Sequence, residues 1–113
     1  MNVDFRYLPE FERRAKALAK KYKSFVKDYD TFLDSMSANP FQGKPLGNGV
    51  YKTRMAITSK GKGKSGGARV LTYNLTMENN DMVVVTLMSV YDKSEISNVK
   101  ETYIDSLVKQ IIK

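Results

Sequence analysis

The feature that most constrains the fold is a change in the spacing of apolar residues along the chain. In the first third, apolar residues recur at alternating intervals of four and three: Phe11, Ala15, Leu18, Tyr22, Phe25, Tyr29, Phe32 and Met36. This spacing predicts an amphipathic helical region, because residues three and four apart share one face of an α-helix. One long helix and two helices separated near Ser24 both satisfy it. From Val50 onwards apolar and polar residues alternate instead, which predicts strands.

The residues on either side of the helical region define its limits. The stretch VDFRYL, just before it, alternates as a strand does, and Pro9 followed by Glu10 is typical of a first helical turn. Beyond it, ANPFQGKPLGNG contains two prolines and three glycines, which predicts a loop.

Three further strands and a helix are expected in the rest of the chain. The strands are predicted over residues 50–58, 68–77 and 82–91, the last being apolar on both faces and therefore central in the sheet. The helix is expected to begin near Ser97, with these apolar residues on one face: Tyr103, Ile104, Leu107, Val108 and Ile111. The order predicts a single α+β domain, residues 1–113, with a mostly antiparallel sheet.

The excess positive charge of the chain is confined to its middle. The formal net charge is +7, and no Asp or Glu occurs between Ser35 and Met77. Seven cations lie in that segment: Lys44, Lys52, Arg54, Lys60, Lys62, Lys64 and Arg69. Outside it, 12 cations balance 12 acids. Such segregation favours a polyanionic partner, nucleic acid first, over a basic loop kept for solubility.

The residue types that are missing exclude several kinds of chemistry. The chain contains no cysteine and no histidine, which removes thiolate metal sites, disulfides and the commonest general base. We therefore expect neither a metal nor a cofactor, and Mg²⁺ held by acidic residues stays open as the alternative. The N-terminal stretch MNVDFRYLPEF contains acids and no apolar core of secretory length, and no apolar run is long enough to cross a membrane. These features predict a cytoplasmic protein without a membrane partner.

A glycine-rich basic stretch, KGKGKSGGAR, connects two of the predicted strands. Its GKS tripeptide is not a nucleotide-binding P-loop, because Thr58 occupies the position of the required earlier glycine and a strand is predicted to follow. Lys52 and Arg54 share one face of the preceding strand, and Arg69 lies on its presumed antiparallel partner. Paired in this way, the three cations predict a clamp for a phosphodiester, helped by N–H groups of the glycines. The alternative is an ordinary exposed strand face.

The stretch YKTRMAITSKGKGKSGGARVLTY, followed by a hydrophobic strand that ends in SVYDKSE, resembles the RelE/HigB group of bacterial type II toxins. The resemblance implies a RelE-like fold and an mRNA endonuclease that many members direct at the ribosomal A site, where mRNA and rRNA are bound. It also implies a cognate antitoxin protein. The implied reaction needs no metal: a ribose 2′-hydroxyl attacks the adjacent phosphate.

The resemblance and the strand phase together assign roles to individual residues. Arg69 is the predicted phosphate clamp, Lys52 and Arg54 match the family's basic strand, and Lys93 follows the last strand where the family carries a basic residue. Lys52, surrounded by cations, is a candidate general base, and Lys93 is expected to stabilise or protonate the leaving oxygen.

Other residues are assigned by position alone. Three loop lysines are expected to bind the RNA backbone: Lys60, Lys62 and Lys64. The family often places a tyrosine or histidine after the basic position, where this chain has Val99, so Tyr91 is the expected substitute and Glu95 an alternative base.

Two other functions fit the same pattern. A toxin of this fold can act on DNA gyrase, although such a target needs no phosphate clamp. A non-catalytic RNA- or DNA-binding module is the third reading, but aromatic residues for base stacking are missing between Lys52 and Arg69. The charge also predicts that an acidic segment of the antitoxin wraps the basic face.

Overall fold

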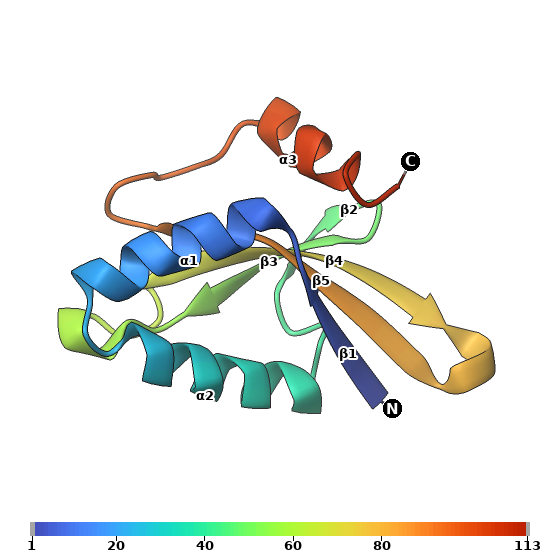
Figure 1. The fold of residues 1–113 in the computed structure, drawn as a ribbon, viewed down its shortest axis with the longest axis horizontal. Coiled ribbons are helices and arrows are strands. Elements are labelled where there is room, and N and C mark those ends of the chain that lie inside the picture. The colour runs from blue at the N-terminus through green and yellow to red at the C-terminus, as the bar shows by residue number, and fades with distance from the viewer. Residues whose placement is uncertain (1, 113) are drawn as a thin grey trace.

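The computed structural model describes residues 2–112, which form an α+β fold of three helices and a five-stranded mixed sheet (Figure 1). In chain order, the elements are β1 (Asn2–Tyr7), α1 (Pro9–Lys21), α2 (Phe25–Ala38), β2 (Lys44–Gly47), β3 (Val50–Met55), β4 (Ala68–Met77), β5 (Met82–Asp92) and α3 (Glu101–Val108). Two 3₁₀ turns, η1 (Thr58–Lys60) and η2 (Glu78–Asn80), precede and follow β4. None of the helices within residues 2–112 has the length and apolar character that a membrane span requires.

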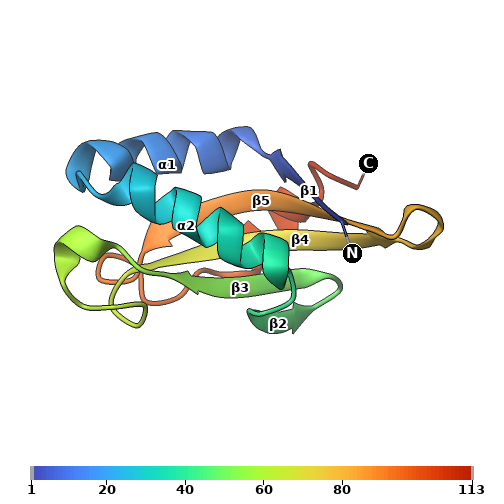
Figure 2. The ribbon, with the colours of Figure 1, turned by 90° about the horizontal axis from the view of Figure 1, so that it is seen from below.

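The N-terminal helical region consists of two helices rather than one. The backbone leaves the helical conformation at Tyr22, with φ −122° and ψ 113°, and α2 starts at Phe25. The break lets both helices lie on the same face of the sheet, as Figure 2 shows. Buried residues from both helices, including Phe11, Leu18 and Phe32, join one core cluster with the sheet. The apolar spacing continues across the break because both helices pack against the same face of the sheet.

The sheet order is β1-β5-β4-β3-β2. β1 runs parallel to β5 and the other three pairings are antiparallel, so the expected mostly antiparallel sheet is confirmed. β5 lies between β1 and β4 and is buried on both faces, as its apolar sequence predicts.

Different helices pack on the two faces of the sheet. The first packs against α1 and α2 through residues such as Val70 and Val85. The second packs against α3, where Leu71 and Met88 meet Leu107. A register shift in the β4–β5 pairing places one extra residue in β5, so that Leu87 and Val90, which are three residues apart, pack in the same cluster.

Three sequence expectations differ from the structure in detail. The predicted loop contains β2, which pairs with β3 through a hairpin whose turn is Asn48-Gly49, both residues having positive φ. The strand predicted over residues 50–58 ends at Met55, because a 3₁₀ turn begins at Thr58. The C-terminal helix begins at Glu101 rather than near Ser97.

Candidate nucleic-acid interface

The cations of β3 face other cations across the sheet. Arg54 lies directly opposite Arg69 of β4, and Lys52 lies directly opposite Leu71. On the other side of β3, Lys52 lies directly opposite Lys44 of β2. Like charges opposed in this way destabilise a sheet, so the two pairs cost folding free energy in the isolated protein.

The face that carries these cations is only partly covered by α3. Side chains two residues apart on a strand share a face, so Val50 and Lys52 lie on the same side of β3, as Arg69 and Leu71 do on β4. Val50 and Leu71 are buried in the cluster under α3. The face therefore changes from apolar to basic where α3 no longer covers it. The change occurs between Val50 and Lys52 on β3 and between Leu71 and Arg69 on β4.

A pocket of about 550 Å³, here called the basic pocket, opens at this place. Its lining residues come from β2, β3, β4 and the segments beside them: Gln42, Gly43, Lys44, Lys52, Thr53, Arg54, Lys64, Arg69 and Lys93. Six of the nine are cations and none is an acid. A pocket with this lining attracts anions, and its size accommodates a phosphodiester group with part of its sugars.

Arg69 is the most buried cation of the pocket, with 6% of its surface exposed. Its guanidinium Nη1 donates to the carbonyl oxygens of Lys64 at 3.2 Å and Ala68 at 3.1 Å, and Nη2 donates to that of Ser65 at 3.1 Å. Burial, followed by the charge of Arg54, lowers the pKa of Arg69. Arg69 thus fixes the glycine-rich loop, and its remaining N–H groups are available to an anion.

The environment of Lys52 disfavours the charged form of its side chain. Burial lowers the pKa of its ammonium, and the positive charges of Lys44, Arg69 and Lys93 lower that pKa further. Within residues 2–112 Lys52 has no ion pair that would oppose this effect. The sequence analysis expected neighbouring cations to lower the pKa of Lys52, and the structure agrees with that direction.

Backbone contacts bring two further cations to the pocket. The backbone N–H of Lys93 donates to the carbonyl oxygen of Gly67 at 3.0 Å, which joins the end of β5 to the end of the glycine-rich loop. Lys64, whose carbonyl accepts from Arg69, also lines the pocket. Five predicted residues, up to 41 positions apart in sequence, therefore lie together: Lys52, Arg54, Lys64, Arg69 and Lys93.

Lys60 and Lys62 are placed differently from Lys64. The Lys60 ammonium lies 2.6 Å from Asp92 Oδ1, with only 8% and 1% of the two side chains exposed, and it lies over the ring of Tyr22. Hydrogen bonds from Lys60, Tyr22 and Ser94 hold the pKa of Asp92 well below its usual range, although burial alone would raise it. Lys60 is therefore committed to a structural ion pair, which differs from its expected role on RNA. Lys62 is exposed at the loop tip, outside the basic pocket.

Tyr91 and Glu95 do not line the basic pocket. Tyr91 lies opposite Arg69 in the β4–β5 pairing but is only 2% exposed, and its hydroxyl is buried with no hydrogen-bond partner in the described part of the chain. Burial raises the pKa of Tyr91, and the charge of Arg69 lowers it. Glu95 forms an ion pair with Lys21 of α1. Neither side chain is placed to take a proton from a group in the pocket.

Lys44 and Gln42 are pocket residues that the sequence interpretation did not select. Both lie in the stretch assigned to a loop, which in the structure leads into β2 and brings Lys44 opposite Lys52. The Asn48-Gly49 dipeptide is the signal that predicts this hairpin, since Asn-Gly favours the two-residue turn between antiparallel strands.

Residues 2–112 contain no group of three acidic side chains placed to bind a metal ion. No protein-family model matches this chain, and no curated protein matches it.

Proposed function

We propose that the protein is an endoribonuclease toxin of the RelE-like type, acting in the cytoplasm on mRNA bound to the ribosome. The observation that carries the proposal is the basic pocket, where six cations from five segments meet without a carboxylate. The opposed pairs Arg54–Arg69 and Lys44–Lys52 lower the stability of the free protein and are relieved when an anion binds between them. The order of strands and helices also agrees with the resemblance found in the sequence.

The proposed reaction is transesterification at one phosphodiester. The ribose 2′-oxygen attacks the adjacent phosphorus while its proton passes to the neutral amine of Lys52. The bond from phosphorus to the 5′-oxygen breaks, and Lys93 donates a proton to that oxygen. Arg54 and the free N–H groups of Arg69 stabilise the negative charge that develops on the phosphoryl oxygens. The products are a 2′,3′-cyclic phosphate and a 5′-hydroxyl.

The partners proposed are those of such a toxin. Lys62 and Lys64, exposed in the glycine-rich loop, bind backbone phosphates of mRNA or rRNA around the cleaved bond. An antitoxin with an acidic segment covers the same basic pocket and so prevents RNA from entering. A toxin that acts on gyrase has no need of an acid-free pocket of phosphate size, so this alternative is less favoured.

A non-catalytic RNA-binding module is the second candidate. It is favoured by one observation: Tyr91 is buried and Glu95 is paired, so Lys52 is the only pocket side chain suited to act as a base. A test of catalysis must therefore separate binding from cleavage.

The test compares wild-type protein with Lys52→Met, using Lys20→Met on the exposed surface of α1 as a charge-matched control. Purified proteins are added to translating ribosomes and to free mRNA, and new 5′ ends are mapped. Wild type and Lys20→Met are expected to produce 5′-hydroxyl ends within reading frames, whereas Lys52→Met binds RNA but produces none. Binding of RNA without cleavage by all three proteins would favour the non-catalytic module. Neither binding nor cleavage of RNA by wild type would favour the toxin that acts on gyrase.

A further inference from the structure

β1 is an edge strand: in Figure 1 it lies beside β5, and no second strand pairs with it within residues 2–112. At its two ends, the backbone N–H groups of Asn2 and Leu8 each donate at 3.0 Å to a carbonyl oxygen in or next to β5. Backbone groups of successive strand residues point to opposite sides, so the even-numbered residues of β1 bind β5. Three odd-numbered residues direct their N–H and C=O groups outward, where no backbone partner meets them within residues 2–112: Val3, Phe5 and Tyr7.

Edge strands usually carry features that prevent another strand from adding to them. The opposite edge of the sheet, β2, has several: it is four residues long, begins with Lys44, contains Pro45 and has a register shift. β1 has none of these features. It is six residues long, contains neither proline nor lysine, and pairs with β5 in one unbroken register. Its outer side is therefore open to a further strand.

The side chains of β1 alternate between an apolar and a charged surface. Val3 and Phe5 pack against the core cluster that α1 and α2 share with the sheet. Asp4 and Arg6 lie on the other face, with 44% and 67% of their side chains exposed. Arg6 Nε lies 3.3 Å from Asp4 Oδ2, but an ion pair so exposed adds little stability to one chain. Two opposite charges at alternate positions suit a neighbouring strand that carries the same two charges in reverse order.

We propose that the protein forms a homodimer in which β1 pairs antiparallel with β1 of a second copy, here called the partner, centred on Phe5. Phe5 then lies opposite the partner's Phe5, and Val3 lies opposite the partner's Tyr7, so apolar side chains meet on one face. Each of these pairs exchanges two hydrogen bonds, because the odd-numbered residues of both strands point toward the other strand. The pairing also covers Tyr7, which is 44% exposed in the single chain.

The charges select this register over its neighbours. With Phe5 at the centre, Asp4 lies opposite the partner's Arg6, and Arg6 lies opposite the partner's Asp4. A slip of two residues in one direction places Asp4 opposite the partner's Asp4, and a slip in the other direction places Arg6 opposite the partner's Arg6. Like charges directly opposite each other destabilise a sheet, so one register is favoured. The pairing is two-fold symmetric and uses each free edge once, so it closes as a dimer.

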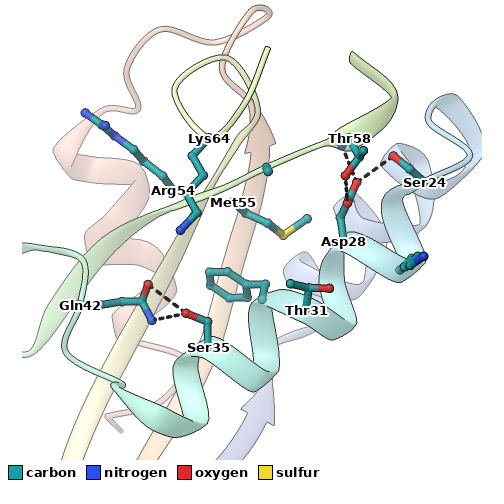
Figure 3. A pocket seen from close by; sticks show the side chains of 12 residues that line it. Ser24, Asp28, Thr31, Ser35, Gln42, Arg54, Met55, Thr58 and Lys64 are labelled. Carbon is teal, nitrogen blue, oxygen red and sulfur yellow. Dashed lines mark hydrogen bonds between the residues drawn. The ribbon is translucent and has the colours of Figure 1, made fainter. Parts of the chain in front are cut away.

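The dimer keeps the basic pocket separate from the interface. Two strands lie between β1 and β3 in the sheet, and no residue of β1 lines the basic pocket. The cavity next to it, shown in Figure 3, shares Arg54 and Lys64 with the basic pocket and is also lined without β1. Each half of the joined sheet therefore carries its own basic pocket. The inference does not depend on what that pocket binds.

Analytical ultracentrifugation of charge-reversal variants tests the pairing. Wild type is expected to sediment with twice the mass of one chain at concentrations up to about 0.5 mM, which allows for the weak association of a small interface. Asp4→Arg and Arg6→Asp are each expected to weaken dimerisation roughly tenfold or more, because both cross-strand charge pairs become like-charged. Lys23→Asp, at an exposed position between α1 and α2, changes the net charge as Arg6→Asp does and should dimerise like wild type.

Mixing the two edge variants separates pairing from damage to the fold. In an equimolar mixture, the two cations of Asp4→Arg lie opposite the two acids of Arg6→Asp, so a dimer of one chain of each is expected to form. A mixture that associates no better than either variant alone overturns the register. A dimer that survives both single reversals shows that another surface holds the copies together. A wild type that stays monomeric at this concentration overturns the proposal and leaves the edge to a strand of a different protein.

Hydrogen exchange of the backbone amides observes the edge directly. In wild type, the outward N–H groups of Val3, Phe5 and Tyr7 are expected to exchange at least tenfold more slowly than in Arg6→Asp. The N–H of Asp4, which points toward β5, should exchange slowly in both proteins and so reports that the strand remains in the sheet. Equal exchange of the outward amides in the two proteins overturns the edge pairing.

Discussion

Arg54 and Arg69 lie directly opposite each other in the antiparallel pairing of β3 and β4. The charge of Arg54 is one of the causes that lower the pKa of Arg69, after burial. A sheet built only for stability places opposite charges or apolar residues at such a pair. The repulsion is therefore best explained as the cost of a binding site for an anion.

The first prediction concerns this repulsion. Arg54→Thr is expected to raise the free energy of unfolding by about 0.2–1 kcal/mol, because it removes one like-charge cross-strand contact. The same variant is expected to bind RNA less tightly and to reduce the slope of log affinity against log salt concentration by about 0.7. Urea denaturation and titrations at several salt concentrations measure the two effects.

Arg54→Lys is the matched control, since it keeps the charge at the same exposed strand position. It should retain both the stability and the salt slope of the wild type. A loss of stability in Arg54→Thr would show that Arg54 contributes packing that outweighs the repulsion.

The second prediction concerns pH. If Lys52 is the base, cleavage rises with pH through the pKa of Lys52, which lies below its ordinary value of 10.5. Lys44→Met removes one of the charges that lower this pKa, so the rising limb of the pH–rate profile should move to higher pH. Rates of RNA cleavage between pH 6 and 10 give the profile. A limb that stays in place would mean that another group accepts the proton.

The lowered pKa of Lys52 also has a consequence for stability. The folded protein holds this proton less tightly than the unfolded chain, so the protonated lysine destabilises the fold. The contribution of Lys52 to stability should therefore increase as the pH rises from the pKa of the folded state towards 10.5. Lys52→Met should remove this part of the pH dependence.

The third prediction separates two neighbouring lysines. Lys60→Met leaves the nearly buried carboxylate of Asp92 without its cation, which is expected to cost about 3–5 kcal/mol of folding free energy. Lys62→Met, at the exposed loop tip, should leave stability unchanged and reduce the salt slope of RNA binding by about 0.7. Chemical denaturation and RNA titration of the two variants test the contrast.

Acid should act on the same ion pair. The contacts of Asp92 hold its pKa below the usual value, so its contribution to stability is complete above about pH 4 and disappears as the pH falls further. In Lys60→Met this loss should be smaller. Equal stability of Lys60→Met and wild type at pH 7 would contradict the buried pair.

The fourth prediction distinguishes two glycines of the basic loop. A Cβ on Gly67 would lie 2.3 Å from the carbonyl oxygen of Met55 and 2.9 Å from the nitrogen of Ile57, both backbone atoms. Gly67→Ala is therefore expected to cost about 2–3 kcal/mol and to displace the loop that Lys93 joins to β5. Gly63→Ala meets open space but has φ +63°, so it should cost about 1 kcal/mol.

Thermal denaturation ranks the two variants, and RNA binding shows whether the loop still forms the pocket. Gly67→Ala should lose RNA affinity along with stability, whereas Gly63→Ala should keep most of it. The reverse order would mean that backbone strain at the loop tip matters more than the contact between the loop and β3.

Much of the architecture follows from local patterns in the sequence. Residues 11–36 predict helix because helical packing requires apolar residues at intervals of three and four, and the break near Ser24 is one of the two forms that this spacing allows. β5 is predicted at the centre because its residues are apolar on both faces. The pairing of β3 with β4 follows from two alternating stretches joined by a flexible turn.

The candidate site was predictable in part for the same reason. Lys52, Arg54 and Arg69 share a face because alternation along strands fixes which way their side chains point, and all three line the basic pocket. Lys44 was missed because β2 is only four residues long and contains Pro45 and Gly47, so its pattern is that of a loop.

The sequence by itself determined most of the helical and strand segments, but not β2, together with the segregated charge and the face on which three cations lie. Only the tertiary structure decided which cations are free and which are paired, because Lys60 in η1 and Asp92 at the end of β5 are 32 residues apart and meet only in the folded chain. It also decided that Tyr91 is buried while Lys93 is exposed. Local spacing sets the direction of a side chain, whereas its partners come from distant segments that only the folded chain brings within reach.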